Sequence, residues 1–65
     1  MKKYEILYTN GKVEIVDHDT MESLVYELES FERDDVSQIH EYDEKNTDEV
    51  GKTIWTEEEG LFVNL

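Results

Sequence analysis

Carboxylate side chains are the groups in this sequence that could do chemistry, because eighteen of its 65 residues are aspartate or glutamate. Acid–base catalysis needs two carboxylates held across a cleft in unlike environments. Here the acids occur in every segment, and nothing in their sequence neighbours marks one of them as buried and perturbed, which is the sign of a catalytic carboxylate. We therefore expect a protein that is not an enzyme.

Asp17-His18-Asp19 is the best local candidate for a metal site, since it offers two carboxylates and an imidazole. Alternate residues of an extended segment point the same way, so Asp17 and Asp19 could converge. A structural metal site needs about four ligands, however, and no second cluster accompanies this one. Asp19 is also placed to cap a helix, and His40 stands alone. We expect no metal ion and no other cofactor.

Composition excludes several other kinds of site. The chain has no cysteine, which excludes a disulfide scaffold, a thiolate zinc site and a cysteine nucleophile. The same property fits the reducing cytoplasm, where we expect the protein to work. The acidic segment that begins at Asp43 has Lys45 where a calcium loop needs an oxygen ligand. No stretch approaches the roughly 20 apolar residues of a membrane span.

Net charge is the most informative property of the chain. Eighteen acidic residues oppose six lysines and arginines, which gives a formal net charge of -12. A magnitude of roughly 2–8 is enough to keep a small domain dispersed. A surface of this sign repels nucleic acid and anionic membranes, so we expect direct binding to neither. It attracts a basic face on another protein, for example one that itself binds nucleic acid.

The first elements that could position these acids are a β-hairpin and a helix. Asn10-Gly11 is typical of a two-residue type I′ turn, which would place Tyr8 opposite Val13 and Ile6 opposite Ile15. Alternation then predicts one apolar sheet face, made of Tyr4, Ile6, Tyr8, Val13 and Ile15.

Residues 20–33 have the period of an amphipathic helix, capped by Asp19 with Glu22 three residues further on. Its apolar stripe, which should pack on the hairpin, is Met21, Leu24, Val25, Leu28 and Phe31.

The second half of the chain predicts more strands. Residues 36–42 favour a third strand, although their apolar spacing also fits a short second helix. Residues 43–51 are polar and predict an exposed loop, residues 52–56 predict a strand, and residues 61–65 could add a last one. The expected fold class is α+β: a small antiparallel sheet in the order β-β-α-β-β, with room for a fifth strand, and one amphipathic helix packed on one face. Residues 1–65 should form a single acidic domain.

The placement of the acids predicts a partner-binding surface. Glu32, Asp34 and Asp35 crowd the end of the predicted helix, where the helix dipole makes each negative charge cost about 0.3–1 kcal/mol. A fold of this size gives up stability by keeping them there, and a binding function is one reason to tolerate the loss, with drift above a stability threshold as another.

Spacing on the helix suggests what such a surface could imitate. Helix positions three or four apart lie about 5–6 Å from each other, close to the spacing of successive phosphates. Glu22 and Glu29 could thus copy part of a nucleic acid, with exposed Tyr26 between them as an anchor, because aromatic residues dominate interface energies. Together with the acids of the 43–51 loop, the predicted partner-binding residues are Glu22, Tyr26, Glu29, Asp34, Asp35, Asp43, Glu44, Asp48 and Glu49.

In general character the chain resembles short proteins of phages and mobile elements: it is tiny, acidic and free of cysteine, with an N-terminal Asn-Gly hairpin and one helix. Several such proteins inhibit host enzymes or defence complexes, and some are nucleic-acid mimics. The resemblance implies an inhibitor that docks on a basic partner surface, and it assigns a role to no residue.

The alternative hypothesis is a small homodimeric structural or assembly module. Its contact face would be the second face of the sheet, with Leu7, Val16 and either Trp55 or Phe62.

Overall fold

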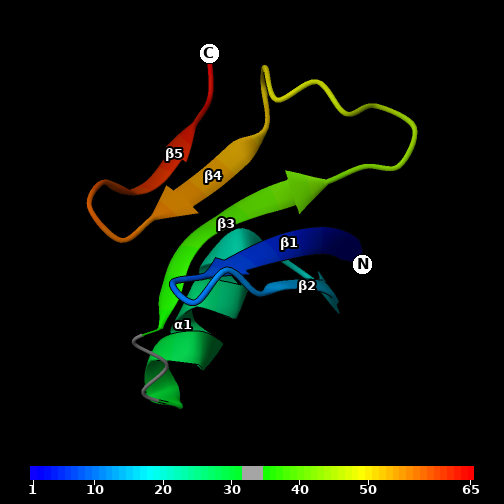
Figure 1. Cartoon of the computed structure of the whole chain (residues 1–65). Coiled ribbons are helices and arrows are strands. Elements are labelled where there is room, and N and C mark those ends of the chain that lie inside the picture. The colour runs from blue at the N-terminus through cyan, green and yellow to red at the C-terminus, as the bar shows by residue number, and fades with distance from the viewer. Residues whose placement is uncertain (32–34) are drawn as a thin grey trace.

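The fold is a five-stranded antiparallel sheet with a helix on one face (Figure 1). The computed structural model describes residues 1–31 and 35–65. The strand order is β2-β1-β3-β4-β5, and the elements are β1 (Lys2–Tyr8), β2 (Val13–His18), α1 (Met21–Ser30), β3 (Val36–Tyr42), β4 (Thr53–Thr56) and β5 (Gly60–Val63). The expected α+β class is confirmed, and the last segment supplies the fifth strand. No helix in the described ranges is long and apolar enough to cross a bilayer.

The hairpin loop differs from the predicted one by a single residue. The Gly11 N–H donates to the Tyr8 carbonyl at 3.0 Å, and the Tyr8 N–H donates to the Lys12 carbonyl at 2.9 Å. With Gly11 at a φ of 90°, this is a three-residue loop in which glycine takes the left-handed position after a turn. The predicted two-residue turn is wrong, because Asn-Gly fits both loop lengths.

This extra residue changes which side of β2 faces the helix. Ile6 lies opposite Glu14, and Leu7 lies opposite Val13. A shift of one residue turns every side chain of a strand to the other face. Val13 and Ile15 therefore lie on the face away from α1, where they are 57% and 45% exposed, while Val16 packs against the core.

β3 is a strand, so the alternative short helix is wrong. Its apolar residues, Val36 and Ile39, are an odd number of positions apart and yet both face the core. A bulge explains this spacing: Leu7 pairs with Gln38, whereas Tyr8 pairs with Val36, so one additional residue is inserted in β3. The bulge restores both apolar residues to the helix side of the sheet.

The helix is shorter than predicted at both ends. Thr20, and not Asp19, is the N-cap, since its Oγ1 accepts a hydrogen bond from the Ser23 N–H at 3.1 Å. α1 ends at Ser30, and Phe31 follows as a C-cap residue that is 69% exposed. The prediction that Phe31 belongs to the core is therefore wrong.

The core lies between α1 and the sheet. Tyr4 and Ile6 from β1 and Ile39 from β3 are each 1% exposed and form its centre. The whole cluster comprises Tyr4, Ile6, Tyr8, Met21, Leu24, Val36 and Ile39, with Val16, Val25, Leu28 and Trp55 packed around it. Because Val16 and Trp55 face the core, they are not part of the second sheet face for which the sequence proposed them.

Candidate functional site

The predicted partner-binding residues form two separate groups. Glu22, Tyr26 and Glu29 lie on α1, whereas the acids of the 43–51 loop lie at the end of the sheet farthest from the last turn of α1 (Figure 1). Asp34 lies outside the described residues.

Glu22, Tyr26 and Glu29 form one stripe, which we call the acidic helix face. Their spacing of four and three residues places them above one another along one side of α1, where Glu22 borders a groove beside Leu61 and Glu29 borders a hollow beside Val36. All three side chains are exposed, Tyr26 to 75%. α1 contains no lysine or arginine, and none of the described cations forms an ion pair with Glu22 or Glu29.

The aspartates of the 43–51 loop are engaged in holding that loop. Asp43 Oδ1 accepts a hydrogen bond from the Lys45 N–H at 2.9 Å. Asp48 Oδ1 accepts one from the Val50 N–H at 3.1 Å. Each carboxylate thus bonds to a backbone amide two residues further on, which is a local turn in which the side chain replaces a backbone carbonyl. These two residues have a structural role that accounts for their presence.

The glutamates of the loop lie beside cationic or imidazole groups. Lys3 Nζ lies 3.4 Å from Glu44 Oε1, and His40 Nδ1 lies 3.2 Å from Glu49 Oε2. Lys52 belongs to the same region, where its Nζ donates to the Asn46 carbonyl at 2.6 Å. Lysines therefore accompany the loop acids, and this end of the molecule is less negative than the acidic helix face.

Asp35 connects the hairpin to the start of β3. Its carbonyl accepts a hydrogen bond from the Thr9 N–H at 2.8 Å, and the residue is half-buried. It is therefore less accessible to a partner than Glu22 or Glu29.

Glu57-Glu58-Glu59 is a second exposed acidic segment that the predicted site omitted. It forms the turn between β4 and β5 and lines a depression together with Ser37 and Gln38. Glu29 lines a small hollow beside Val36, so both acidic regions flank the beginning of β3. The alternation of strand direction in an antiparallel sheet could have predicted this, because it places the β4–β5 turn at the same end as the last turn of α1.

Both histidines lie beside side chains that can share a hydrogen bond with the ring. His18 Nε2 lies 2.7 Å from Glu27 Oε2, and its Nδ1 is buried with no hydrogen-bond partner among the described residues. His40 has Gln38 Oε1 at 2.8 Å from Nε2 and Glu49 at its other nitrogen. In both histidines the accessible ring nitrogens already have protein partners.

The Asp17-His18-Asp19 segment does not converge on one point. Asp17 pairs with Lys3 and His18 with Lys2 on β1, so these successive side chains point to opposite faces of the sheet. In the described part of the chain, no three histidine, aspartate or glutamate side chains are grouped so that they could hold a metal ion.

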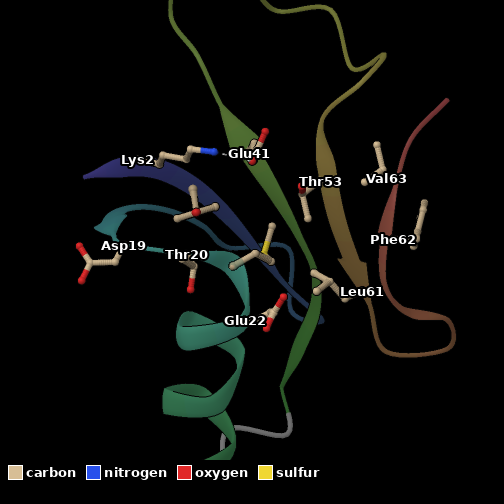
Figure 2. A pocket seen from close by; sticks show the side chains of 11 residues that line it. Lys2, Asp19, Thr20, Glu22, Glu41, Thr53, Leu61, Phe62 and Val63 are labelled. Carbon is tan, nitrogen blue, oxygen red and sulfur yellow. Dashed lines mark ion pairs between the residues drawn. The ribbon is translucent and has the colours of Figure 1, made fainter.

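A groove of about 350 Å³ lies between the start of α1 and strand β5 (Figure 2). Its apolar lining includes Met21 and Leu61, and its carboxylates come from Asp19, Glu22 and Glu41. Burial, together with the negative charges of Glu41 and Asp19, raises the pKa of Tyr4 above its ordinary value of 10.0. The groove is thus an apolar recess in a negative field.

Comparison of the chain with protein-family models, with curated proteins and with solved structures found no match.

Proposed function

We propose that the protein is a non-enzymatic binding protein whose acidic helix face docks on a basic surface of a partner protein. The single observation that carries the proposal is Tyr26, which is 75% exposed between two carboxylates on a helix without lysine or arginine. A large exposed ring with charged neighbours of one sign is typical of an interface anchor with a polar rim. The net charge of -12 would also speed the encounter with a basic partner.

The kind of partner follows from the geometry of the stripe. Glu22 and Glu29 place two carboxylates two turns apart on a rigid helix, about 10 Å along its axis, which is near the distance between alternate phosphates of a nucleic acid strand. A basic groove built for nucleic acid is therefore the surface that the acidic helix face fits, and the protein would act as an inhibitor by occupying it. A chain without cysteine fits this task in the reducing cytoplasm.

Charge reversal on the helix tests this function. The variant Glu22→Lys/Glu29→Lys is compared with Glu44→Lys/Glu49→Lys, which changes net charge by the same amount on the other predicted group. Each is immobilised, and the proteins captured from a cell lysate are quantified at low and high salt. We expect the wild type and the loop variant to capture the same basic proteins at low salt, and the helix variant to lose them. High salt should release them, since screening weakens such contacts.

Two results would contradict the proposal. One is a helix variant that captures the same basic proteins as the wild type while folding normally by circular dichroism. The other is capture that does not change with salt. Addition of nucleic acid should release the captured proteins if they bind through a nucleic-acid groove, so release is also expected in that competition.

The second candidate function is a homodimeric assembly module, and one observation favours it. Val13 and Ile15 are 57% and 45% exposed on the sheet face away from α1, which also carries Leu7. Exposed apolar side chains grouped on a sheet are a common dimer contact. Sedimentation of the wild type beside Val13→Lys/Ile15→Lys tests it: a dimer that the variant dissociates, and that persists at high salt, supports the module.

A further inference from the structure

The β5 edge of the sheet is short but carries no charged side chain and no proline. β5 is an outermost strand, and within the described ranges β4 is its only neighbour in the sheet. Native edge strands are protected by charged side chains, proline or bulges. β5 reads Gly-Leu-Phe-Val, and its Leu61 and Val63 are 42% and 52% exposed. The other edge strand, β2, carries Glu14 and Asp17.

Leu61 and Val63 also direct their backbone groups away from β4. One residue further on, the Asn64 N–H donates to the Lys52 carbonyl at 2.9 Å, so Asn64 is a hydrogen-bonded position of this ladder. Hydrogen-bonded and non-hydrogen-bonded positions alternate along an antiparallel pair. Leu61 and Val63 are therefore the positions whose N–H and C=O groups face outward. An added strand would bond to these two residues.

The groove beside this edge has an apolar floor and an acidic rim. Figure 2 shows Leu61 and Val63 on the β5 side and Glu22 on the α1 side. Asp19 and Glu41 add two further carboxylates, and the one lysine in the lining, Lys2, lies 3.5 Å from Glu41. The recess therefore has more negative than positive groups, and Leu61 and Val63 of the β5 edge belong to its lining.

We infer that β5 accepts an extended basic segment of the partner as a sixth, antiparallel strand, with arginine side chains at alternate positions entering the groove. The inference rests on the proposed function, because it names the segment of that basic partner. An arginine has an aliphatic stem that can cover Leu61 and Val63 and a guanidinium that can bond a carboxylate such as Glu22.

Charge complementarity decides between a partner and a second copy as the occupant. A second copy would bring another net charge of -12, and its own β5 has no cation to place in the groove. An antiparallel direction is chosen because the four strand pairs of the sheet are antiparallel.

Backbone methylation of a peptide tests strand addition directly. The probe is a fluorescent peptide in which valine and arginine alternate. With its arginines opposite Leu61 and Val63, the arginine N–H groups point toward β5 and the valine N–H groups point away. We expect methylation of the backbone nitrogens of the arginines to weaken peptide binding roughly tenfold or more, because it removes backbone hydrogen bonds to β5. Methylation of the backbone nitrogens of the valines should leave the affinity nearly unchanged.

A matched pair of protein variants locates the site. Leu61→Lys/Val63→Lys changes the β5 edge, and Val13→Lys/Ile15→Lys makes the same change on β2 at side chains of similar exposure. Fluorescence anisotropy should show the peptide bound by the wild type and by the β2 variant, and bound roughly tenfold or more weakly by the β5 variant, whose added positive charges oppose arginine. Should the β5 variant fail to fold, the two methylated peptides decide the question on the wild type.

Three results would overturn the inference. They are equal binding of the two methylated peptides, equal loss of binding in the β2 variant, and a wild-type dimer that Leu61→Lys/Val63→Lys dissociates, which would mean that a second copy occupies the edge. The proposed function has its own separate readout in Glu29→Lys, since Glu29 does not line the groove. If Glu29→Lys no longer captures basic proteins from lysate but still binds the peptide, the result would support both the proposed function and strand addition at β5.

Discussion

His18 on β2 and Glu27 on α1 are joined by a contact of 2.7 Å between Nε2 and Oε2. Few residues connect the helix to β2, so this contact helps to fix the orientation in which α1 lies on the sheet. His18 Nδ1 is buried without a hydrogen-bond partner among the described residues, so Nε2 makes the side-chain contact of this ring. The contact adds to the apolar packing of Met21 and Leu24 in holding α1 on the sheet.

The His18–Glu27 contact should be measurable as a coupling energy. In a double-mutant cycle of His18→Ala and Glu27→Gln, we expect a coupling of about 0.5–1 kcal/mol in the free energy of unfolding, the value of a partly exposed hydrogen bond. Urea unfolding at neutral pH measures it. A coupling near zero would mean that α1 is held by its apolar contacts alone.

Gly11→Ala should destabilise the hairpin. Gly11 has a φ of 90°, and no heavy atom lies within 4 Å of the place where a Cβ would stand, so the cost comes from backbone conformation and not from a clash. We expect a loss of about 1–2 kcal/mol in the free energy of unfolding. Thr9→Ala in the same loop is the control and should change it by less than about 0.5 kcal/mol. Equal effects of the two substitutions would argue against the three-residue loop.

The free energy of unfolding should fall at alkaline pH as the Tyr4 hydroxyl loses its proton. Its pKa is raised in the folded state by burial and by the charges of Glu41 and Asp19. The folded protein thus holds this proton more tightly than the unfolded chain, so its contribution is fully present below pH 10.0 and is lost as pH rises through the pKa of the folded state. In the variant Tyr4→Phe, the free energy of unfolding should fall less steeply with pH than in the wild type. Chemical unfolding across this range gives the comparison, and parallel curves for both proteins would refute the assignment.

Added salt should stabilise the folded protein. Because the net charge is -12, repulsion between carboxylates outweighs the two lysine–glutamate pairs of the described residues. Salt shortens the distance over which charges act to about 10 Å at 0.1 M and less above it. The midpoint temperature of thermal unfolding should rise as sodium chloride is added. It should stay constant when the buffer compound is exchanged at fixed pH and ionic strength. A falling midpoint would show that attractive pairs dominate.

Local patterns in the sequence were sufficient to predict the elements. Alternation in residues 3–8 and the helical period of Met21, Leu24 and Leu28 report which side chains avoid water, and the structure buries these residues wholly or partly. The first hairpin, the helix and the α+β class were therefore predictable, whereas residues 36–42 also fitted a short helix and the fifth strand was only an option.

Features that depend on one inserted residue could not be predicted. Asn10-Gly11 fits a two-residue and a three-residue loop, and only the observed hydrogen bonds of Tyr8 show which is formed. The bulge in β3 is of the same kind, because it reverses the parity of Val36 and Ile39 without leaving a sequence signal. Each such residue decides which side chains face α1.

The candidate site was predictable only in part, since its pieces come from distant segments. Glu22, Tyr26 and Glu29 belong to one helix, so their common face followed from the helical period. Sequence could not show that Glu44 and Glu49 lie beside Lys3 and His40, because those contacts depend on how the loop returns to the sheet.

Binding of a captured basic protein to the two charge-reversal variants tests the central claim most directly. The partner recovered from lysate is purified and titrated calorimetrically with the wild type, with Glu22→Lys/Glu29→Lys and with Glu44→Lys/Glu49→Lys at low ionic strength. We predict that the wild type and the loop variant bind with similar affinity, while the helix variant binds at least roughly a hundredfold more weakly, as expected when interface charges are reversed. Equal affinity of all three proteins would contradict the account.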